Sequence, residues 1–332
     1  MECSGRRAQR WRRVRKLLPS RIYWTRSFEC SDDGVLVPAL QSRSEREPLH
    51  PIIDAHVHVW SGDILRYPFG PHDGLSHPAE EATINDFCAS AAGANLRDVV
   101  LIQPRIYGYD HACVYDVAAA LKGHARVVPS VNVRRDRATR ELREFAADPL
   151  TAAFRVVALG DAPANWLSWP SAHQAWETAA ELDLPVDMLI DACQIPLVEQ
   201  VAAAHPDLTI IIDHMARCTP TFQPEYAPPL YDLAKHSNIY MKLSAVDRLS
   251  EGEFPFKDMW NLMAGLYREY GPSRLLWGSD WPHLQGAVTY RQSSVPIREA
   301  LPNASEHDID ALFTKTAASL FGFNPIEIAK NE

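Results

Sequence analysis

From Pro51 onward, short apolar runs alternate with segments whose apolar residues recur at helical spacing, and the alternation repeats eight times. The runs are rich in β-branched residues and nearly continuous, which is typical of parallel strands buried on both faces. The expected strands cover residues 52–60, 98–103, 127–133, 152–158, 185–190, 209–215, 239–245 and 275–281. Strands and helices in this order predict an α/β fold.

Eight strand–helix units predict a (β/α)8 barrel, the TIM barrel. An open, doubly wound sheet is the alternative, but no glycine-rich phosphate loop follows the first expected strand. Single barrels of this kind run to about 250 residues, so a chain of 332 residues need not contain two folded domains. We therefore expect residues 51–332 to form one barrel, and residues 1–50 to be an extension outside it.

The N-terminal extension differs from the rest of the chain in charge. Residues 1–30 contain nine Lys or Arg and only two acidic residues, whereas the whole chain has a formal net charge of −9. The Arg-rich, acid-free stretch at 6–26 is typical of a mitochondrial transit peptide, and a disordered tail is the alternative. The six cysteines are scattered and no secretory signal is evident. We therefore expect a cytoplasmic protein, with the mitochondrion as the alternative.

The acidic character of the remaining chain limits its partners. An acidic body has no general attraction for nucleic acid and repels anions at long range. No run of about 18 apolar residues is present, so we expect no membrane span. A small anionic substrate would need arginine or lysine side chains placed locally to bind it. The sequence leaves the oligomeric state open.

Four polar residues lie at the ends of expected strands, where a barrel of this kind carries its chemistry. His56 and His58 come late in the first strand and share a face, because side chains at i and i+2 of a strand point the same way. His214 comes late in the sixth strand, and Asp280 in the eighth. Imidazoles can bind a metal or polarise a carbonyl oxygen, and a carboxylate beside them can accept a proton. Packed core histidines and an aspartate in a turn are the alternatives.

Four stretches carry a resemblance to a known family. They are residues 53–58 (Ile-Asp-Ala-His-Val-His), 212–217 (Ile-Asp-His-Met-Ala-Arg), 241–250 (Met-Lys-Leu-Ser-Ala-Val-Asp-Arg-Leu-Ser) and 276–283 (Leu-Trp-Gly-Ser-Asp-Trp-Pro-His). With them the chain resembles the amidohydrolase-related branch of the amidohydrolase superfamily, and most closely the 2-pyrone-4,6-dicarboxylate lactonase family. The resemblance implies that Asp280 is the general base, and that His56, His58 and His214 surround the scissile carbonyl.

The resemblance also implies a reaction, the opening of a small carboxylate-bearing lactone by hydrolysis. Pyrone dicarboxylates and muconolactone-like acids, which belong to aromatic catabolism, are the substrates of this kind. A metal-dependent decarboxylase of an aromatic or unsaturated carboxylic acid is the alternative, since related barrels catalyse that reaction. A barrel that binds a ligand without catalysis is a third reading.

Several arginines near the ends of expected strands can supply the local positive charge. They are Arg105, Arg155, Arg217 and Arg248. A guanidinium binds a carboxylate through two parallel hydrogen bonds, so converging arginines favour an anionic substrate, and surface ion pairs are the alternative. Arg105 and Tyr107 match the loop position where the family holds a substrate carboxylate. The strand around Arg155 departs from the family, because residues 160–169 contain no further Arg or Lys.

A metal is not required if the lactonase resemblance holds. Many superfamily members bind a divalent ion through two histidines of the first strand, a histidine of the fifth and an aspartate of the eighth. The expected fifth strand has no histidine. His56, His58 and Asp280 remain as three ligands, which suffice for catalytic zinc, and Asp187 could add an oxygen. One zinc or manganese ion is therefore the alternative.

Overall fold

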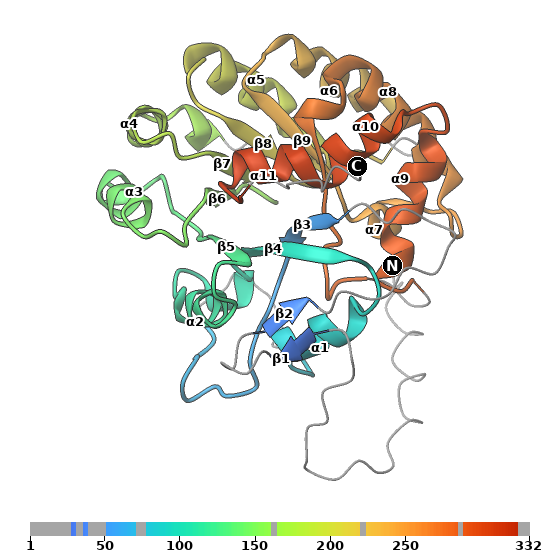
Figure 1. Ribbon diagram of the computed structural model, residues 1–332. Coiled ribbons are helices and arrows are strands. Elements are labelled where there is room, and N and C mark those ends of the chain that lie inside the picture. The colour runs from blue at the N-terminus through green and yellow to red at the C-terminus, as the bar shows by residue number, and fades with distance from the viewer. Residues whose placement is uncertain are drawn as a thin grey trace, which may run out of the picture.

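A computed structural model describes residues 28–30, 36–38, 51–70, 78–160, 165–219, 224–284 and 288–324 (Figure 1). Within the expected extension it describes two short strands, β1 (Phe28–Cys30) and β2 (Leu36–Pro38), which pair antiparallel. The stretch predicted to be a transit peptide or a tail, residues 6–26, lies outside the described residues.

All eight expected strands are present, with ends shifted by a few residues, and they form two parallel sheets. The first sheet contains β3 (Ile52–Val57), β4 (Leu96–Ile102) and β5 (Ala125–Val128). The second contains β6 (Phe154–Val157), β7 (Val186–Leu189), β8 (Ile210–Ile212), β9 (Ile239–Leu243) and β10 (Leu275–Trp277). In both sheets the strands pair in chain order, so the α/β fold with parallel strands is confirmed.

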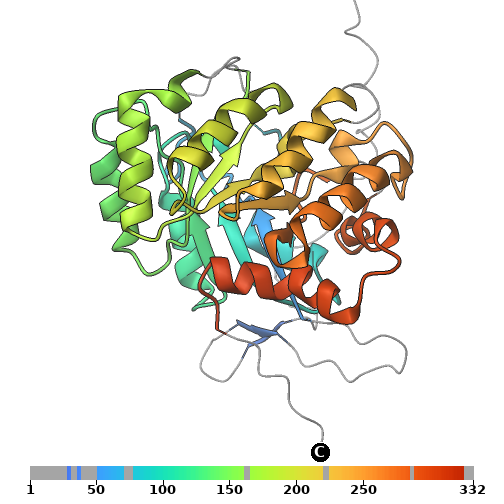
Figure 2. The same ribbon diagram turned by 90° about the horizontal axis from the view of Figure 1, so that it is seen from above.

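Isolated parallel bridges connect the two sheets at both free edges. The bridges are Val127–Thr151 and Ser130–Arg155 between the β5 and β6 segments, and Val57–Trp281 between the β3 and β10 segments. At the second edge the amide of His58 donates to the carbonyl of Trp281 (2.8 Å), and the amide of Asp280 donates to that of His56 (2.9 Å). Viewed from above, the strands lie at the centre and the helices around them (Figure 2).

The helices follow the strands in alternation. They are α1 (Ile84–Ser90), α2 (Ala112–Ala120), α3 (Ala138–Ala146), α4 (Pro170–Glu181), α5 (Ile195–Ala204), α6 (Ala227–Asp232), α7 (Val246–Leu249), α8 (Trp260–Tyr270), α9 (Val295–Ala300), α10 (Glu306–Asp310) and α11 (Thr316–Leu320). Helix α1 begins at a capping box, in which Thr83 and Asp86 each accept a hydrogen bond from the backbone amide of the other. Proline at the first position starts α4. No helix in the described ranges is both long and apolar enough to cross a membrane.

The strands carry two apolar faces. One face packs against the helices, and the other forms an inner core that includes Ile53, Val100, Val128, Ile211 and Leu276. Phe321, at the end of α11, belongs to the inner core. The side chains of Arg97 and Arg126, near the starts of β4 and β5, donate to carbonyls of the residues that follow α11. The C-terminal helix therefore covers the amino ends of the strands, which leaves the carboxyl ends for a site.

Candidate active site

A β-bulge in β3 turns His56 toward the interior. The register of β3 against β4 shifts between Asp54 and Val57. Asp54 points away from the interior. Its carboxylate accepts a hydrogen bond from the Tyr290 hydroxyl (3.0 Å), which lies in the core between the strands and the helices. Ala55 belongs to the inner core, yet His56 also faces inward, because the bulge interrupts the alternation of side chains. Strict alternation would have placed His56 on the same side as Asp54.

Gly278 makes room for this arrangement. A Cβ atom at position 278 would lie 2.6 Å from the Cβ of His56 and 3.0 Å from its backbone nitrogen. Those distances are shorter than any ordinary contact, so a larger residue would push the imidazole or its strand aside. The glycine precedes Asp280 by two residues and thus fits the turn after β10 against the bulge of β3.

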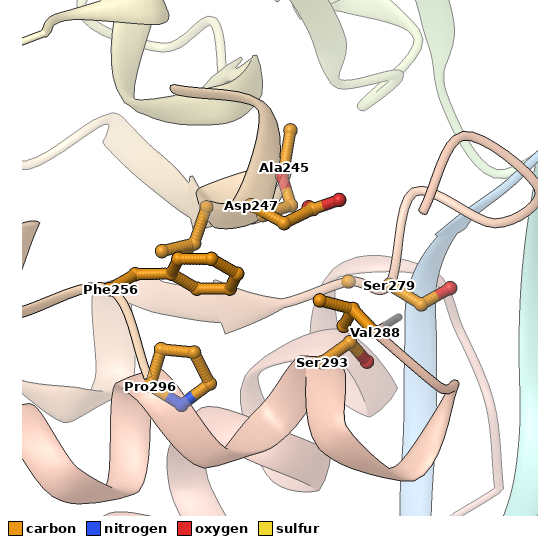
Figure 3. Close-up of a pocket in the computed structure, with 10 residues that line it drawn as sticks. Ala245, Asp247, Phe256, Ser279, Val288, Ser293 and Pro296 are labelled. Atoms are coloured by element: carbon orange, nitrogen blue, oxygen red, sulfur yellow. The ribbon is translucent and has the colours of Figure 1, made fainter. Parts of the chain in front are cut away.

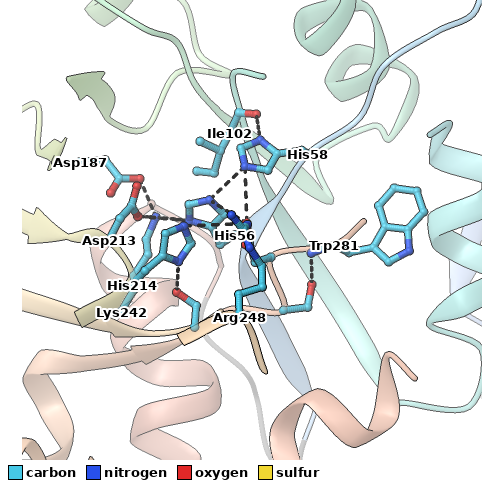
Figure 4. A network of polar contacts seen from close by, with 12 residues as sticks. His56, His58, Ile102, Asp187, Asp213, His214, Lys242, Arg248 and Trp281 are labelled. Atoms are coloured by element: carbon cyan, nitrogen blue, oxygen red, sulfur yellow. Dashed lines mark hydrogen bonds and ion pairs between the residues drawn. The ribbon is translucent and has the colours of Figure 1, made fainter. Parts of the chain in front are cut away.

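Four sequence-predicted residues converge at the carboxyl ends of the strands, and all are buried (Figure 4). Asp280 Oδ1 lies 3.6 Å from His56 Nε2, 3.6 Å from His58 Nε2 and 3.8 Å from His214 Nε2. The two Nε2 atoms of His56 and His58 are 3.2 Å apart. One carboxylate oxygen thus faces three imidazole nitrogens.

His214 and Asp280 occupy turns rather than strands. Strand β8 ends at Ile212 and β10 at Trp277, each earlier than expected. Both residues have positive φ angles, 52° for His214 and 59° for Asp280, a conformation that L-residues adopt rarely and that is common at functional sites. His214 Nδ1 lies 2.7 Å from the Ser244 hydroxyl, which fixes the orientation of the ring.

One carboxylate oxygen of Asp280 pairs with an arginine, and the other makes no hydrogen bond to the described residues. Arg248 NH1 lies 2.6 Å from Oδ2. Oδ1 is buried and accepts no hydrogen bond from the described residues. Burial would raise the pKa of Asp280, but His214 and His56 lower it more, so its pKa lies below the usual range for aspartate. Asp280 is therefore ionised at neutral pH, with Oδ1 facing the site.

The three imidazoles are neutral at neutral pH. Burial lowers the pKa of His56 to about 3 and that of His214 to about 4, and it lowers the pKa of His58 well below its ordinary value. His58 Nδ1 lies 2.9 Å from the carbonyl oxygen of Ile102. A carbonyl oxygen can only accept, so the single proton of neutral His58 sits on Nδ1. Its Nε2 therefore faces the site as a hydrogen-bond acceptor.

The donor set fits a divalent cation. Ligand atoms around tetrahedral zinc lie about 3.4 Å apart, from bond lengths of about 2.0–2.1 Å. His56 Nε2, His58 Nε2 and Asp280 Oδ1 lie 3.2–3.6 Å apart, and the Asp280 oxygen is buried without a hydrogen bond. These three residues form one candidate group for a metal, and His56, Asp213 and His214 form a second. The first group is the set that the sequence indicated.

A second set of charged residues lies beside the first, inside the strands. Lys242 Nζ is 2.5 Å from Asp187 Oδ2 and 3.2 Å from Asp213 Oδ1. Arg155 NH2 is 2.8 Å from Asp213 Oδ2. All four side chains are buried, and we call them the inner charge cluster. It contacts the site through His56, whose Nδ1 is 3.1 Å from Asp213 Oδ1 and 3.3 Å from Lys242 Nζ.

The two aspartates of the inner charge cluster have pKa values shifted in opposite directions. Burial and the neighbouring Asp213 raise the pKa of Asp187 to about 8. Burial acts on Asp213 in the same direction, but Lys242 and His56 outweigh it and hold the pKa of Asp213 well below its usual range. Asp213 is therefore the permanent anion of the cluster.

The other sequence-predicted residues have varied surroundings. Tyr107 is buried, and its hydroxyl accepts a hydrogen bond from the amide of Ser61 (3.0 Å). Arg217 is exposed, and its Nε lies 3.4 Å from Asp191 Oδ1. Arg105 begins a short 3-10 helix directly after β4 and is part-buried. Arg155, by contrast, belongs to the inner charge cluster.

A family model described as amidohydrolase matches residues 53–323. The chain belongs to the amidohydrolase family. The match covers strands β4 to β10, all of β3 except its first residue, and all the residues of the site.

Several known proteins are similar to this amidohydrolase in sequence or structure. It is 27% identical over 235 residues to L-fucono-1,5-lactonase of Burkholderia ambifaria, which covers 69% of this chain and 80% of the relative. It is 26% identical over 265 residues to 4-sulfomuconolactone hydrolase of Rhizobium radiobacter, covering 76% and 84%. A crystal structure of a putative 2-pyrone-4,6-dicarboxylic acid hydrolase from Pseudomonas putida superimposes with a TM-score of 0.71 at 25% identity, covering 83% and 99%.

Sequence reasoning missed one residue of the amidohydrolase site, His283. Its backbone amide donates to the carbonyl of Asp280 (2.8 Å). Its ring lies 5.3 Å from that of His58 and 5.7 Å from that of Trp60, centre to centre. The signal was present in the sequence, because His283 follows Asp280 by three residues within a stretch that carried the family resemblance.

The inner charge cluster was also missed as a unit. Its signal is the presence of Arg155, Asp187 and Lys242 in the middle of otherwise apolar strands. Charges of both signs in such places must pair when they are buried.

A small cavity of about 10 Å³ lies beside the turn that follows β10 (Figure 3). It is lined by residues adjacent to the site, among them Ser244, Asp247, Gly278 and Ser279, and not by the three imidazoles. Its volume is close to that of a single water molecule. It is therefore too small to be the substrate pocket.

Proposed function

We propose that this amidohydrolase opens a small lactone by hydrolysis, and that the substrate carries an acidic group. The observation that carries the proposal is the position of Asp280 Oδ1, a buried and ionised oxygen that faces three neutral imidazoles without a hydrogen bond. Two relatives, one acting on a sugar lactone and one on a sulfomuconolactone by their names, support the same reaction class.

In the proposed reaction, a water molecule lies between Asp280 Oδ1 and His58 Nε2, both of which are acceptors. Its oxygen attacks the lactone carbonyl while Asp280 takes its proton. His214 stabilises the oxyanion when Ser244 donates to its Nδ1, because its own proton is then on Nε2. The ring C–O bond breaks, and the leaving alkoxide takes the proton back from Asp280. The product is an open-chain hydroxy acid.

Arg248 is the arginine best placed to meet an acidic group of the substrate. It is 39% exposed and reaches Asp280 from the rim, so a carboxylate could bind its remaining N–H groups. We propose Arg105 and Arg217 as further contacts. For Arg155 and Tyr107, whose polar groups bond to Asp213 and Ser61, we propose a role in holding the site.

A bound divalent ion is compatible with the same residues. His56, His58 and Asp280 would hold it, and it would supply a water molecule with a lowered pKa. We propose that the chain does not require this ion.

We also infer that the bridged strands close into a complete (β/α)8 barrel from β3 to β10, with residues 1–50 outside it. The bridges at both edges of the two sheets support closure.

The test is a lactone panel assayed before and after exhaustive chelation, with metal analysis of the same preparation. The panel contains a sugar lactone, a muconolactone and a pyrone dicarboxylate. Hydrolysis of an acidic lactone by metal-free protein is the expected result. Loss of activity on chelation, restored by zinc or manganese, would contradict metal independence, and release of CO2 from a carboxylic acid would replace the lactonase proposal by decarboxylation.

A further inference from the structure

His56 Nδ1 lies between two groups with opposite requirements. Lys242 Nζ, 3.3 Å away, can only donate a hydrogen bond, and Asp213 Oδ1, 3.1 Å away, can only accept one. Neutral imidazole carries one proton, so Nδ1 can satisfy only one of them. The choice decides whether Nε2 presents a hydrogen or a lone pair to the site.

The geometry at Nδ1 favours Lys242. The contact between Lys242 Nζ and His56 Nδ1 has the geometry of a hydrogen bond. Asp213 Oδ1 accepts no hydrogen bond from the described residues, although it is close. An N–H in the plane of the ring therefore does not point at this oxygen.

The other side of the ring leads to the same assignment. His56 Nε2 is 3.2 Å from His58 Nε2. The latter is an acceptor, because the proton of His58 is on Nδ1 and bonds to Ile102. With a proton on His56 Nε2 the two rings form a hydrogen bond. Without it, two lone pairs would face each other at that distance.

We infer that Lys242 holds His56 in the tautomer that carries its proton on Nε2. This hydrogen bonds to His58 Nε2 in the free protein, and it can pass to the carbonyl oxygen of the substrate when His58 Nε2 accepts from the attacking water instead. Lys242 is thus a positioning residue, buried behind the imidazole. The role toward the carbonyl rests on the proposed function, but the tautomer does not.

A consequence concerns metals. A nitrogen that carries a hydrogen cannot ligate an ion, so a metal at Nε2 needs the proton on Nδ1. Asp213 Oδ1, 3.1 Å away, can accept it there once the ring or the carboxylate turns into alignment. Lys242 and Asp213 therefore favour opposite uses of the same ring. Lys242 favours hydrogen-bond donation, and Asp213 favours metal binding.

The direct test is the 15N NMR spectrum of the histidine side chains in the metal-free, full-length protein, with His56 assigned by its loss in His56→Gln. We expect an Nε2–H tautomer in the wild type and an Nδ1–H tautomer in Lys242→Met. Lys242→Gln keeps an N–H donor and should retain the wild-type tautomer. Asp187→Asn, which alters a partner of Lys242 without contacting His56 directly, is the matched control and should also retain it. A wild-type Nδ1–H signal would overturn the inference.

The second readout is zinc affinity, measured by calorimetry on the apo-protein. We expect Lys242→Met to bind zinc about tenfold more tightly and Asp213→Asn about tenfold more weakly than the wild type. Simple destabilisation would move both in the same direction, which would overturn the inference. If Lys242→Met fails to fold by circular dichroism, Lys242→Gln and Asp213→Asn carry the test. If the expected tautomers are observed but no lactone is hydrolysed, only the proposed function is contradicted.

Discussion

Two buried polar layers lie side by side in this protein, and they differ in how closely their charged groups approach one another. In the inner charge cluster, Lys242 and Arg155 lie 2.5–3.2 Å from side-chain oxygens of Asp187 and Asp213. In the site, Asp280 Oδ1 stays 3.6–3.8 Å from the three imidazoles. Charged groups of the inner cluster contact one another directly, whereas Asp280 Oδ1 faces three neutral imidazoles without a hydrogen bond. We propose that this difference separates residues that hold the structure from residues that contact the substrate.

The strongest test of the site is the substitution Asp280→Asn. An amide cannot accept the proton of the attacking water, so we expect kcat on the best lactone of the panel to fall by about 10²–10⁴-fold, with the fold retained. The control is Asp191→Asn, which removes the rim partner of Arg217 and should change kcat little. Wild-type turnover by Asp280→Asn would show that another group is the base.

The substitution Arg155→Met removes one cation from the inner charge cluster. This arginine is 2% exposed, and its loss leaves Asp213 with one buried cation fewer. We expect the free energy of unfolding, from urea denaturation, to fall by about 3–5 kcal/mol. Arg143→Met is the control, because Arg143 pairs with Glu181 on the surface (3.1 Å) and should have little effect. An increase in KM without a loss of stability would instead assign Arg155 to the substrate.

The substitution Gly278→Ala disturbs His56, which contacts both the inner charge cluster and Asp280. The added methyl group would lie 2.6 Å from His56 Cβ, so we expect a loss of about 1–3 kcal/mol in stability together with a lower kcat. In the control Gly62→Ala, the methyl group would meet the carboxylate end of the exposed Glu81 side chain at 2.9 Å, which can move aside. Equal effects of the two substitutions would contradict the role given to Gly278.

The last test separates the site from the rest of the fold by pH. Burial lowers the pKa of His111 to about 4, against about 6.5 in an unfolded chain. The unfolded state therefore binds more protons between these values, and His111 makes stability fall as pH decreases from about 6.5 toward 4, by at most about 1.4 kcal/mol per pH unit. His111→Gln should reduce this slope in urea titrations and leave kcat at neutral pH unchanged. An unchanged slope would show that His111 is not buried as a neutral ring.

The fold was predictable because its signal is repeated. Eight apolar runs, separated by helical segments, predict parallel strands even if one run is misjudged. The ends of the strands were less predictable, and β8 shows why. The expected strand extends to Met215, but the backbone turns with positive φ at His214. No glycine in residues 210–217 marks that turn in the sequence.

The identities of the converging residues were predictable, whereas their hydrogen bonds were not. His56, His58, His214 and Asp280 follow from strand ends and the family resemblance. The inward direction of His56 depends on a bulge that strict alternation does not contain. The partner of Arg155 is 58 residues away in the chain, at Asp213, so pairing of this kind requires three-dimensional structure.

The bridge between Val57 and Trp281 has a mechanical consequence. The edge between β3 and β10 is held by few backbone hydrogen bonds compared with the interior of either sheet. His58 lies on one side of this edge and Asp280 on the other. A ligand that binds both would act as a clasp across the joint, so its binding energy would also slow amide hydrogen exchange along the two edges.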